Sequence, residues 1–130
     1  VVDIERIGDY SKNILDLAIH YPDKLNTKTL HPELYEIEQV VKTRFDKTVD
    51  AIKTEDIELA SKLIKGFKKQ VTTASDRIVN NIISGEINIE SGSESAAIVL
   101  YARYLKRIGS HLKNITTTVI NPIDSIGYQS

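Results

Sequence analysis

The sequence predicts an all-α protein, an antiparallel helical bundle, and two observations support this. Apolar residues recur at alternating spacings of three and four along four long stretches, which places each set on one face of a helix. No stretch alternates apolar and polar residues for long enough to indicate a sheet. The three prolines, Pro22, Pro32 and Pro122, fall between the periodic stretches and therefore mark helix borders. Helices joined by short turns favour antiparallel neighbours packed at shallow angles.

The first expected helix covers residues 1–20. Its apolar residues share one heptad, with Ser11 in the polar gap, and they are Ile4, Ile7, Ile14 and Ala18. Residues 21–30 contain a proline, an asparagine and several threonines, and we interpret them as a linker. Helical periodicity already runs at Val1, so we expect the natural chain to extend upstream, with residues 1–20 as the last helix of a preceding unit.

Residues 31–122 are expected to form a three-helix bundle, followed by a C-terminal tail at 123–130. Its first helix begins at His31 and Pro32, with a looser stripe formed by Leu34, Ile37, Val41, Phe45, Val49 and Ile52. On the polar face, Glu38 and Lys42 lie four apart, in the order that favours an ion pair.

The next helix is expected to be long and unbroken, from a cap at Asp56 or Thr54 to Gly85. Its stripe consists of Ala60, Ile64, Phe67, Val71, Ala74, Ile78 and Ile82. The last helix has the strongest pattern, formed by Ile98, Tyr101, Leu105, Ile108, Leu112, Ile115 and Val119. Ser91 and Glu94 have capping-box spacing at its start, and Asn121 precedes the proline at its end.

The composition argues against several classes of function. The 130 residues suffice for one domain, and 17 lysines and arginines nearly balance 18 aspartates and glutamates, so no strong field steers the chain toward nucleic acid or anionic lipid. The absence of cysteine excludes disulfides and thiolate sites and fits the cytoplasm, which we expect as the location. No apolar run reaches the roughly 20 residues that span a bilayer, so we expect no direct membrane insertion.

An internal repeat links the two ends of the chain. At an offset of 101 residues, ERIGDYSKNI (Glu5–Ile14) matches KRIGSHLKNI (Lys106–Ile115) at six of ten positions. The simplest explanation is a duplicated helical unit. Because a glycine inside a helix costs about 1 kcal/mol relative to alanine, we expect close packing, more than ligand contact, at Gly8 and Gly109.

Candidate metal ligands are few. Glu5 and Asp9 lie four apart, so their carboxylates share one helix face, either as a solvated pair or as ligands of a cation. The second copy has Lys106 and Ser110 at these positions, and the ammonium would repel a metal ion. The three histidines lack di-iron or zinc-protease spacing, and we interpret His111 as a flanking surface residue. No phosphate loop, nucleophile elbow or catalytic triad is present, so we expect no enzyme.

These two segments, E-R-I-G-D-Y and A-R-Y-L-K-R-I-G-S-H-L-K-N-I, resemble the signature helices of PhoU-like proteins. The resemblance places the last helix of one three-helix repeat before a complete second repeat, and the closing INPIDSIGYQ resembles the ends of archaeal members. It implies a regulator of phosphate uptake that contacts a phosphate transporter or a sensor kinase, often as a homodimer. Members hold iron or zinc through E-x-x-x-D motifs, and only Glu5 and Asp9 match such a motif here.

Two alternatives remain open. Similar helical repeats occur as accessory cytoplasmic domains of phosphate or ion transporters, which an upstream membrane segment would indicate. Some members carry an AbrB-like DNA-binding module upstream. Because the helices present no basic recognition face, nucleic acid would be bound only through such a missing module.

Overall fold

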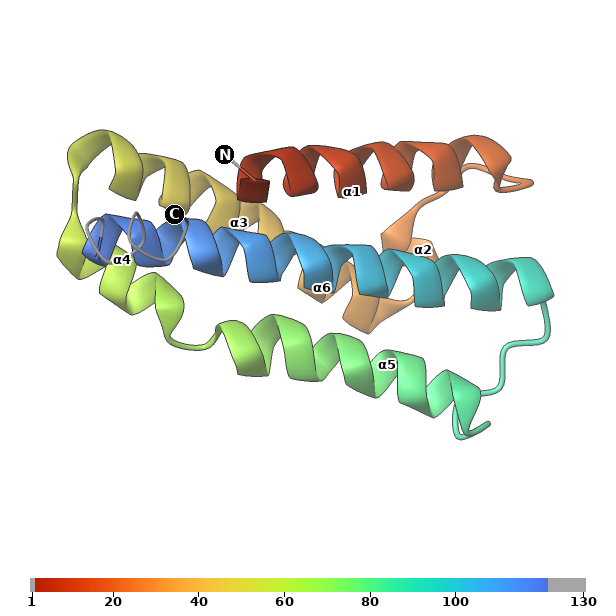
Figure 1. The fold of residues 1–130 in the computed structure, drawn as a ribbon. Helices are drawn as coiled ribbons and strands as arrows, with labels where there is room; N and C mark the ends of the chain where they lie inside the picture. Colours follow the sequence, from red (N-terminus) through yellow and green to blue (C-terminus); the bar gives the residue numbers. More distant parts are fainter. Residues whose placement is uncertain (1, 122–130) are drawn as a thin grey trace.

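The computed structural model describes residues 2–121, and within that range every regular element is helical (Figure 1). In chain order the elements are α1 (Val2–His20), α2 (Thr27–Leu30), α3 (Pro32–Thr54), α4 (Ile57–Ile64), the π-helical segment η1 (Lys68–Thr73), α5 (Ala74–Ile83) and α6 (Gly92–Ile120). The prediction of an all-α helical bundle is confirmed. The expected tail at 123–130 and the border at Pro122 lie outside the described residues.

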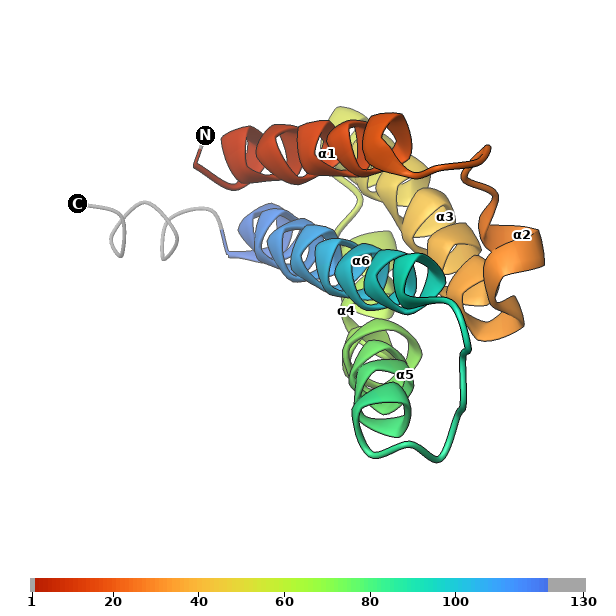
Figure 2. The ribbon, with the colours of Figure 1, turned by 90° about the vertical axis from the view of Figure 1, so that its right-hand side faces the viewer.

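Helix α6 is the centre of the bundle. It contacts α1, α3, α4, η1 and α5, and in Figure 2 it lies between α1 and α5 with α3 at its side. Its predicted stripe supplies much of the core, since Ile98, Tyr101, Leu105, Ile108 and Leu112 are all buried. No helix within residues 2–121 combines the length and apolar character needed to cross a bilayer.

Three predicted helix starts are present, each with a side chain that accepts a hydrogen bond from a free backbone N–H of the first turn. His31 Nδ1 begins α3 by accepting from Glu33 N at 3.2 Å. The Asp56 carboxylate begins α4 in the same way, and Ser91 Oγ begins α6 by accepting from Glu94 N at 3.2 Å. These caps are local, which is why the sequence reveals them.

The expected linker contains a short helix. The Asn26 side chain accepts from Lys28 N at 3.0 Å and begins α2. Thr27 is buried, and its hydroxyl donates to Glu38 of α3 at 3.2 Å. Residues 21–30 therefore include an ordered element that packs against α3.

The helix predicted to run unbroken from Asp56 to Gly85 is interrupted, so that prediction was wrong. Helix α4 ends at Ile64, Lys65 is extended, and Gly66 has φ +88° before the chain turns helical again. Such a positive φ is readily available only to glycine. The interruption divides the predicted stripe between α4 and the η1–α5 segment, while both parts still face α6.

The buried face of α3 also differs from the predicted one. Phe45 and Ile52, assigned to the stripe, are 43% and 46% exposed. The buried positions after Val41 are Arg44, Thr48 and Ala51. Thr48 can lie inside because its hydroxyl lies 3.2 Å from that of Thr116 on α6. The polar side chains take the inner face because the fold provides hydrogen-bonding partners there.

Candidate functional site

The predicted metal motif lies on α1. Glu5 and Asp9 are both exposed, and Asp9 Oδ2 lies 3.9 Å from Nη1 of Arg6 in a solvated ion pair. No cluster of three or more histidine, cysteine, aspartate or glutamate side chains suited to a metal ion occurs within residues 2–121. Iron and zinc sites generally need four or more ligands. The two carboxylates alone therefore do not make a closed site.

The equivalent positions of the second copy, Lys106 and Ser110, lie on α6, and Lys106 forms an ion pair. Lys106 Nζ lies 2.7 Å from Asp76 Oδ1 of α5, and both side chains are partly shielded from water. Ser110 Oγ donates to the carbonyl oxygen of Lys106 at 3.1 Å, within its own helix. The ammonium occupies the place of the first motif's carboxylate and is neutralised by an acid from a neighbouring helix.

The two repeat glycines have different surroundings. A Cβ atom added to Gly109 would lie 2.8 Å from Cγ1 of Val71, which η1 brings against α6. A Cβ added to Gly8 would meet nothing within 4 Å. Gly109 thus permits a close helix contact, whereas Gly8 faces open space in the described part of the chain.

Helices α1 and α6 lie side by side and run in opposite directions (Figures 1 and 2). Tyr10 and His111, which are equivalent in the repeat, stack with ring centroids 6.1 Å apart and planes at 24°. Asp3 Oδ1 lies 2.7 Å from His111 Nδ1, and the equivalent pair, Tyr104 and Tyr10, is in contact at 6.2 Å between ring centroids. Contacts that recur with their partners exchanged indicate a two-fold relation. The two repeat segments, on α1 and α6, are therefore related by a local two-fold axis.

This contact corrects the interpretation of His111 as a flanking surface residue. Its side chain is 21% exposed, and Asn114 Nδ2 also donates to Asp3, at 3.2 Å. The sequence pattern of α6 places His111 beside the apolar stripe, but it does not reveal that α1 covers this side of the helix.

One face of α1 is exposed, although the equivalent face of α6 is covered by other helices of the bundle. Ile4 and Leu15 are 65% and 64% exposed, whereas the equivalent residues of α6, Leu105 and Thr116, are buried. With Gly8 and Ser11 between them, these residues form a stripe along α1, which we call the α1 stripe. On α6 the same stripe is covered by the helices of the bundle.

A second polar cluster joins α2, α3 and α6. Tyr101 donates a hydrogen bond to Glu38 Oε2, Thr27 donates to Oε1, and Lys42 Nζ lies 3.5 Å from Oε1 as predicted. Burial, together with the hydrogen bond to Glu38 and its negative charge, raises the pKa of Tyr101 above its usual value. The cluster borders a groove of about 430 Å³ beneath α1, whose apolar wall includes Ile7 and Phe45.

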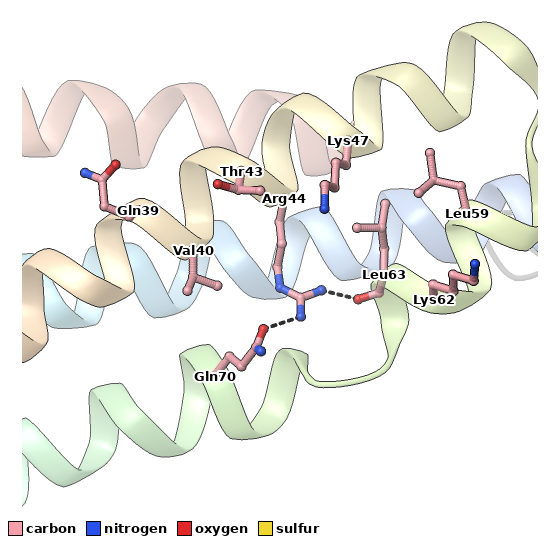
Figure 3. Close-up of a pocket in the computed structure, with 9 residues that line it drawn as sticks. All are labelled: Gln39, Val40, Thr43, Arg44, Lys47, Leu59, Lys62, Leu63 and Gln70. Atoms are coloured by element: carbon pink, nitrogen blue, oxygen red, sulfur yellow. Dashed lines mark hydrogen bonds between the residues drawn. The ribbon is translucent and has the colours of Figure 1, made fainter.

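A cavity of about 440 Å³ opens between α3 and α4, next to the helix break (Figure 3). Arg44 donates through Nη1 to the carbonyl oxygen of Leu63, and through Nη2 to that of Lys65 at 3.2 Å and to Gln70 Oε1. Its guanidinium also lies 4.3 Å from the centre of the Phe67 ring. Burial lowers the pKa of Arg44, which nevertheless stays protonated at neutral pH.

Sequence reasoning missed Arg44, although two signals were present. Arg44 lies three residues after Val41 and four before Thr48, in phase with the buried face of α3. Gly66 interrupts an otherwise helical pattern, and a glycine there marks a place where the chain can turn. Neither signal connects Arg44 with Gly66, because the two residues are 22 positions apart and meet only in the folded chain.

Comparison with known proteins agrees with this architecture. The family model of the PhoU domain matches residues 34–119, which is more than half of the chain and runs from α3 into α6. The chain is 28% identical over 123 residues to a phosphate-specific transport system accessory protein PhoU homolog of Pseudomonas putida. The match covers 92% of this chain and 47% of that protein, so the chain spans about half the length of this relative. No solved structure matches the chain. Because the family model covers residues 34–119, well over half of the chain, the chain belongs to the PhoU domain family.

Proposed function

We propose that this chain is a cytoplasmic regulatory or accessory unit of phosphate uptake that acts by contacting other proteins. The observation that carries the proposal is the PhoU domain match across α3–α6, supported by the relative that is named an accessory protein of a phosphate-specific transport system. The expected partners are a phosphate transporter or a sensor kinase. The chain contributes to this role as a helical surface.

The α1 stripe is the proposed contact surface, and a second copy of the chain is the proposed partner there, giving a homodimer. Its support is the local two-fold symmetry, because the equivalent stripe of α6 packs against helices of its own repeat. The α1 stripe therefore calls for a helical cover, which the helices of a preceding repeat would supply in a longer chain and a second copy would supply for this one. Fully burying a leucine or isoleucine side chain contributes roughly 1.5–3 kcal/mol. Ile4 and Leu15 therefore offer a substantial gain when another molecule covers them.

Assembly is tested by light scattering on the purified chain over a range of concentrations. We expect a dimer that is weakened by the double substitution Ile4→Gln/Leu15→Gln. Ile83→Gln is the matched control, because Ile83 is also an exposed isoleucine, 75% exposed, but lies on α5. A monomer at every concentration would exclude the homodimer.

The regulatory role is tested by deleting the gene in its own organism and measuring phosphate uptake and the expression of phosphate-starvation genes at high phosphate. We expect uptake and expression to lose their response to phosphate and the wild-type gene to restore it. The Ile83→Gln gene should restore the response and the Ile4→Gln/Leu15→Gln gene should not. An unchanged response in the deletion strain would refute the proposal.

Binding of iron or zinc is a separate part of the proposal. Glu5 and Asp9 would supply two oxygen ligands, and the others would come from water or a partner protein. Mass spectrometry of protein purified without chelator should find metal that Glu5→Ala/Asp9→Ala removes. Asp46→Ala/Asp50→Ala is the matched control, since these carboxylates are also exposed and four apart on α3. If the wild-type chain holds no stoichiometric metal, this part fails and the partner-binding role stands.

A further inference from the structure

The cavity beside the helix break concentrates positive charge. Three of its nine lining residues are cationic, namely Arg44, Lys47 and Lys62, and none is acidic (Figure 3). The remaining lining is apolar or neutral and consists of Gln39, Val40, Thr43, Leu59, Leu63 and Gln70. The charges of the whole chain nearly balance, so three cations around one cavity are a local excess of positive charge. Their mutual repulsion is unfavourable unless an anion offsets it.

Arg44 is the most buried of the three cations, with 8% of its surface exposed. Every hydrogen bond that it makes within residues 2–121 goes to a neutral acceptor, either a backbone carbonyl or the amide of Gln70. Its Nε is buried and donates to nothing in this part of the chain. A buried cation without a carboxylate partner is unfavourable, and the carbonyls at the end of α4 compensate its charge only in part.

Lys47 and Lys62 are available to bind an anion, because neither is held by a strong ion pair within the described residues. Lys62 Nζ lies 3.6 Å from Glu58 Oε1, but both side chains are more than 70% exposed, so this ion pair is weak. Lys47 forms no ion pair within the described residues, although it borders the same cavity. An incoming anion would therefore displace at most one weak interaction.

We propose that this cavity binds inorganic phosphate. Arg44 lines the cavity but is only 8% exposed, which favours a small free ion over the side of a folded partner as its ligand. Phosphate carries between one and two negative charges at neutral pH, and its oxygens accept hydrogen bonds from guanidinium and ammonium groups. The amides of Gln39 and Gln70 and the hydroxyl of Thr43 add neutral hydrogen-bonding groups to the site.

This inference goes beyond the proposed function, which needs no small ligand. It makes the chain a receptor for phosphate through residues of α3, α4 and η1, away from Glu5 and Asp9 on α1. The site spans the break at Gly66, because Arg44 also holds the carbonyl groups on the α4 side of that break. Bound phosphate would therefore reinforce the junction between α4 and α5.

The test is a titration of the ¹⁵N-labelled chain with sodium phosphate, followed by two-dimensional NMR at constant pH and ionic strength. We expect saturable shifts centred on the amides of Lys47, Lys62 and Gln70. Sulfate, also a divalent tetrahedral anion, should compete, whereas acetate should bind much more weakly. Lys47→Gln and Lys62→Gln should each weaken phosphate binding about three- to tenfold. Lys12→Gln, an equal charge loss on exposed α1, should leave it unchanged.

Three results would overturn the inference. The first is no saturable shift up to roughly 20 mM phosphate, a concentration that would detect even millimolar affinity. The second is wild-type affinity in both lysine variants, and the third is acetate binding as tightly as phosphate. Arg44 is kept in these experiments because its removal would also disturb the helix break. The gene-deletion experiment tests the regulatory role separately, so the two proposals can fail independently.

Discussion

The ring of Tyr10 on α1 stacks on the ring of His111 on α6, and the two residues are separated by the 101-residue offset of the internal repeat. Equivalent positions of two copies meet in this way when a two-fold axis passes between them. The two signature helices therefore pack on each other, and the surroundings of one helix indicate what the other can bind.

Alanine substitution should have opposite effects at the two repeat glycines. Gly8→Ala should raise the free energy of unfolding by about 0.5–1 kcal/mol, because alanine favours the helix and its Cβ meets nothing. Gly109→Ala should lower it by about 1–2 kcal/mol, because its Cβ would press on buried, β-branched Val71. Urea unfolding of both variants measures the difference. Equal destabilisation would mean that Gly8 is also closely packed in solution.

Gly66→Ala should destabilise the chain by about 1 kcal/mol or more. Its φ of +88° is unfavourable for alanine, and the new Cβ would lie 3.1 Å from Nη2 of Arg44. Gly85→Ala is an informative control, because Gly85 has a similar φ of +83° but open space around it. A larger loss at Gly66 than at Gly85, measured by urea unfolding, would isolate the contact with Arg44. Equal losses would show that backbone strain alone matters.

Tyr101→Phe should change the stability of the chain at alkaline pH. The folded state raises the pKa of Tyr101, so it holds the phenolic proton more tightly than the unfolded chain does. The associated stability is fully present below about pH 10, the ordinary tyrosine pKa, and is lost as the pH rises toward the higher folded value. The wild type should therefore lose more stability above pH 10 than the phenylalanine variant. Parallel stability curves for the two proteins would contradict this coupling.

Asp3→Ala should loosen α1 from α6. It removes the 2.7 Å contact with His111 and the hydrogen bond from Asn114, and it should destabilise the protein by about 1 kcal/mol. Asp16→Ala removes the same charge from an exposed position of α1 and should change stability by less than about 0.5 kcal/mol. Amide hydrogen exchange along α1 provides the measurement. Unchanged exchange in Asp3→Ala would show that this contact does not hold the helix.

The features predictable from the sequence are those set by local spacing. The caps at His31, Asp56 and Ser91 depend on residues a few positions apart, and all three are present. The stripe of α6 depends on similar spacing, and its members from Ile98 to Leu112 are buried, whereas Ile115 and Val119 are only partly buried. The helix break could not be predicted in this way, because Gly8 and Gly109 also interrupt helical patterns and the helices continue through them. What distinguishes Gly66 is Arg44, which lies 22 positions earlier in the chain and binds the carbonyls at the break.

The candidate sites show the same limit. The E-x-x-x-D motif of Glu5 and Asp9 is visible in the sequence because the residues are four apart, but their exposure follows from what covers α1. The cavity charges come from two helices that meet only after folding, with Arg44 and Lys47 on α3 and Lys62 on α4. No spacing rule relates such residues, so the cavity was absent from the sequence-based prediction.

The π-helical segment η1 has a consequence for how this domain tolerates change in length. Each of its turns holds about one residue more than an α-helical turn, which is the form that a single-residue insertion takes when both flanks keep their packing. Val71 at its centre is buried, and so are Phe67 before it and Ile78 after it. A one-residue insertion or deletion in η1 can therefore be accommodated within its wide turn. This requires space for Val71, which Gly109 on α6 provides because it has no side chain.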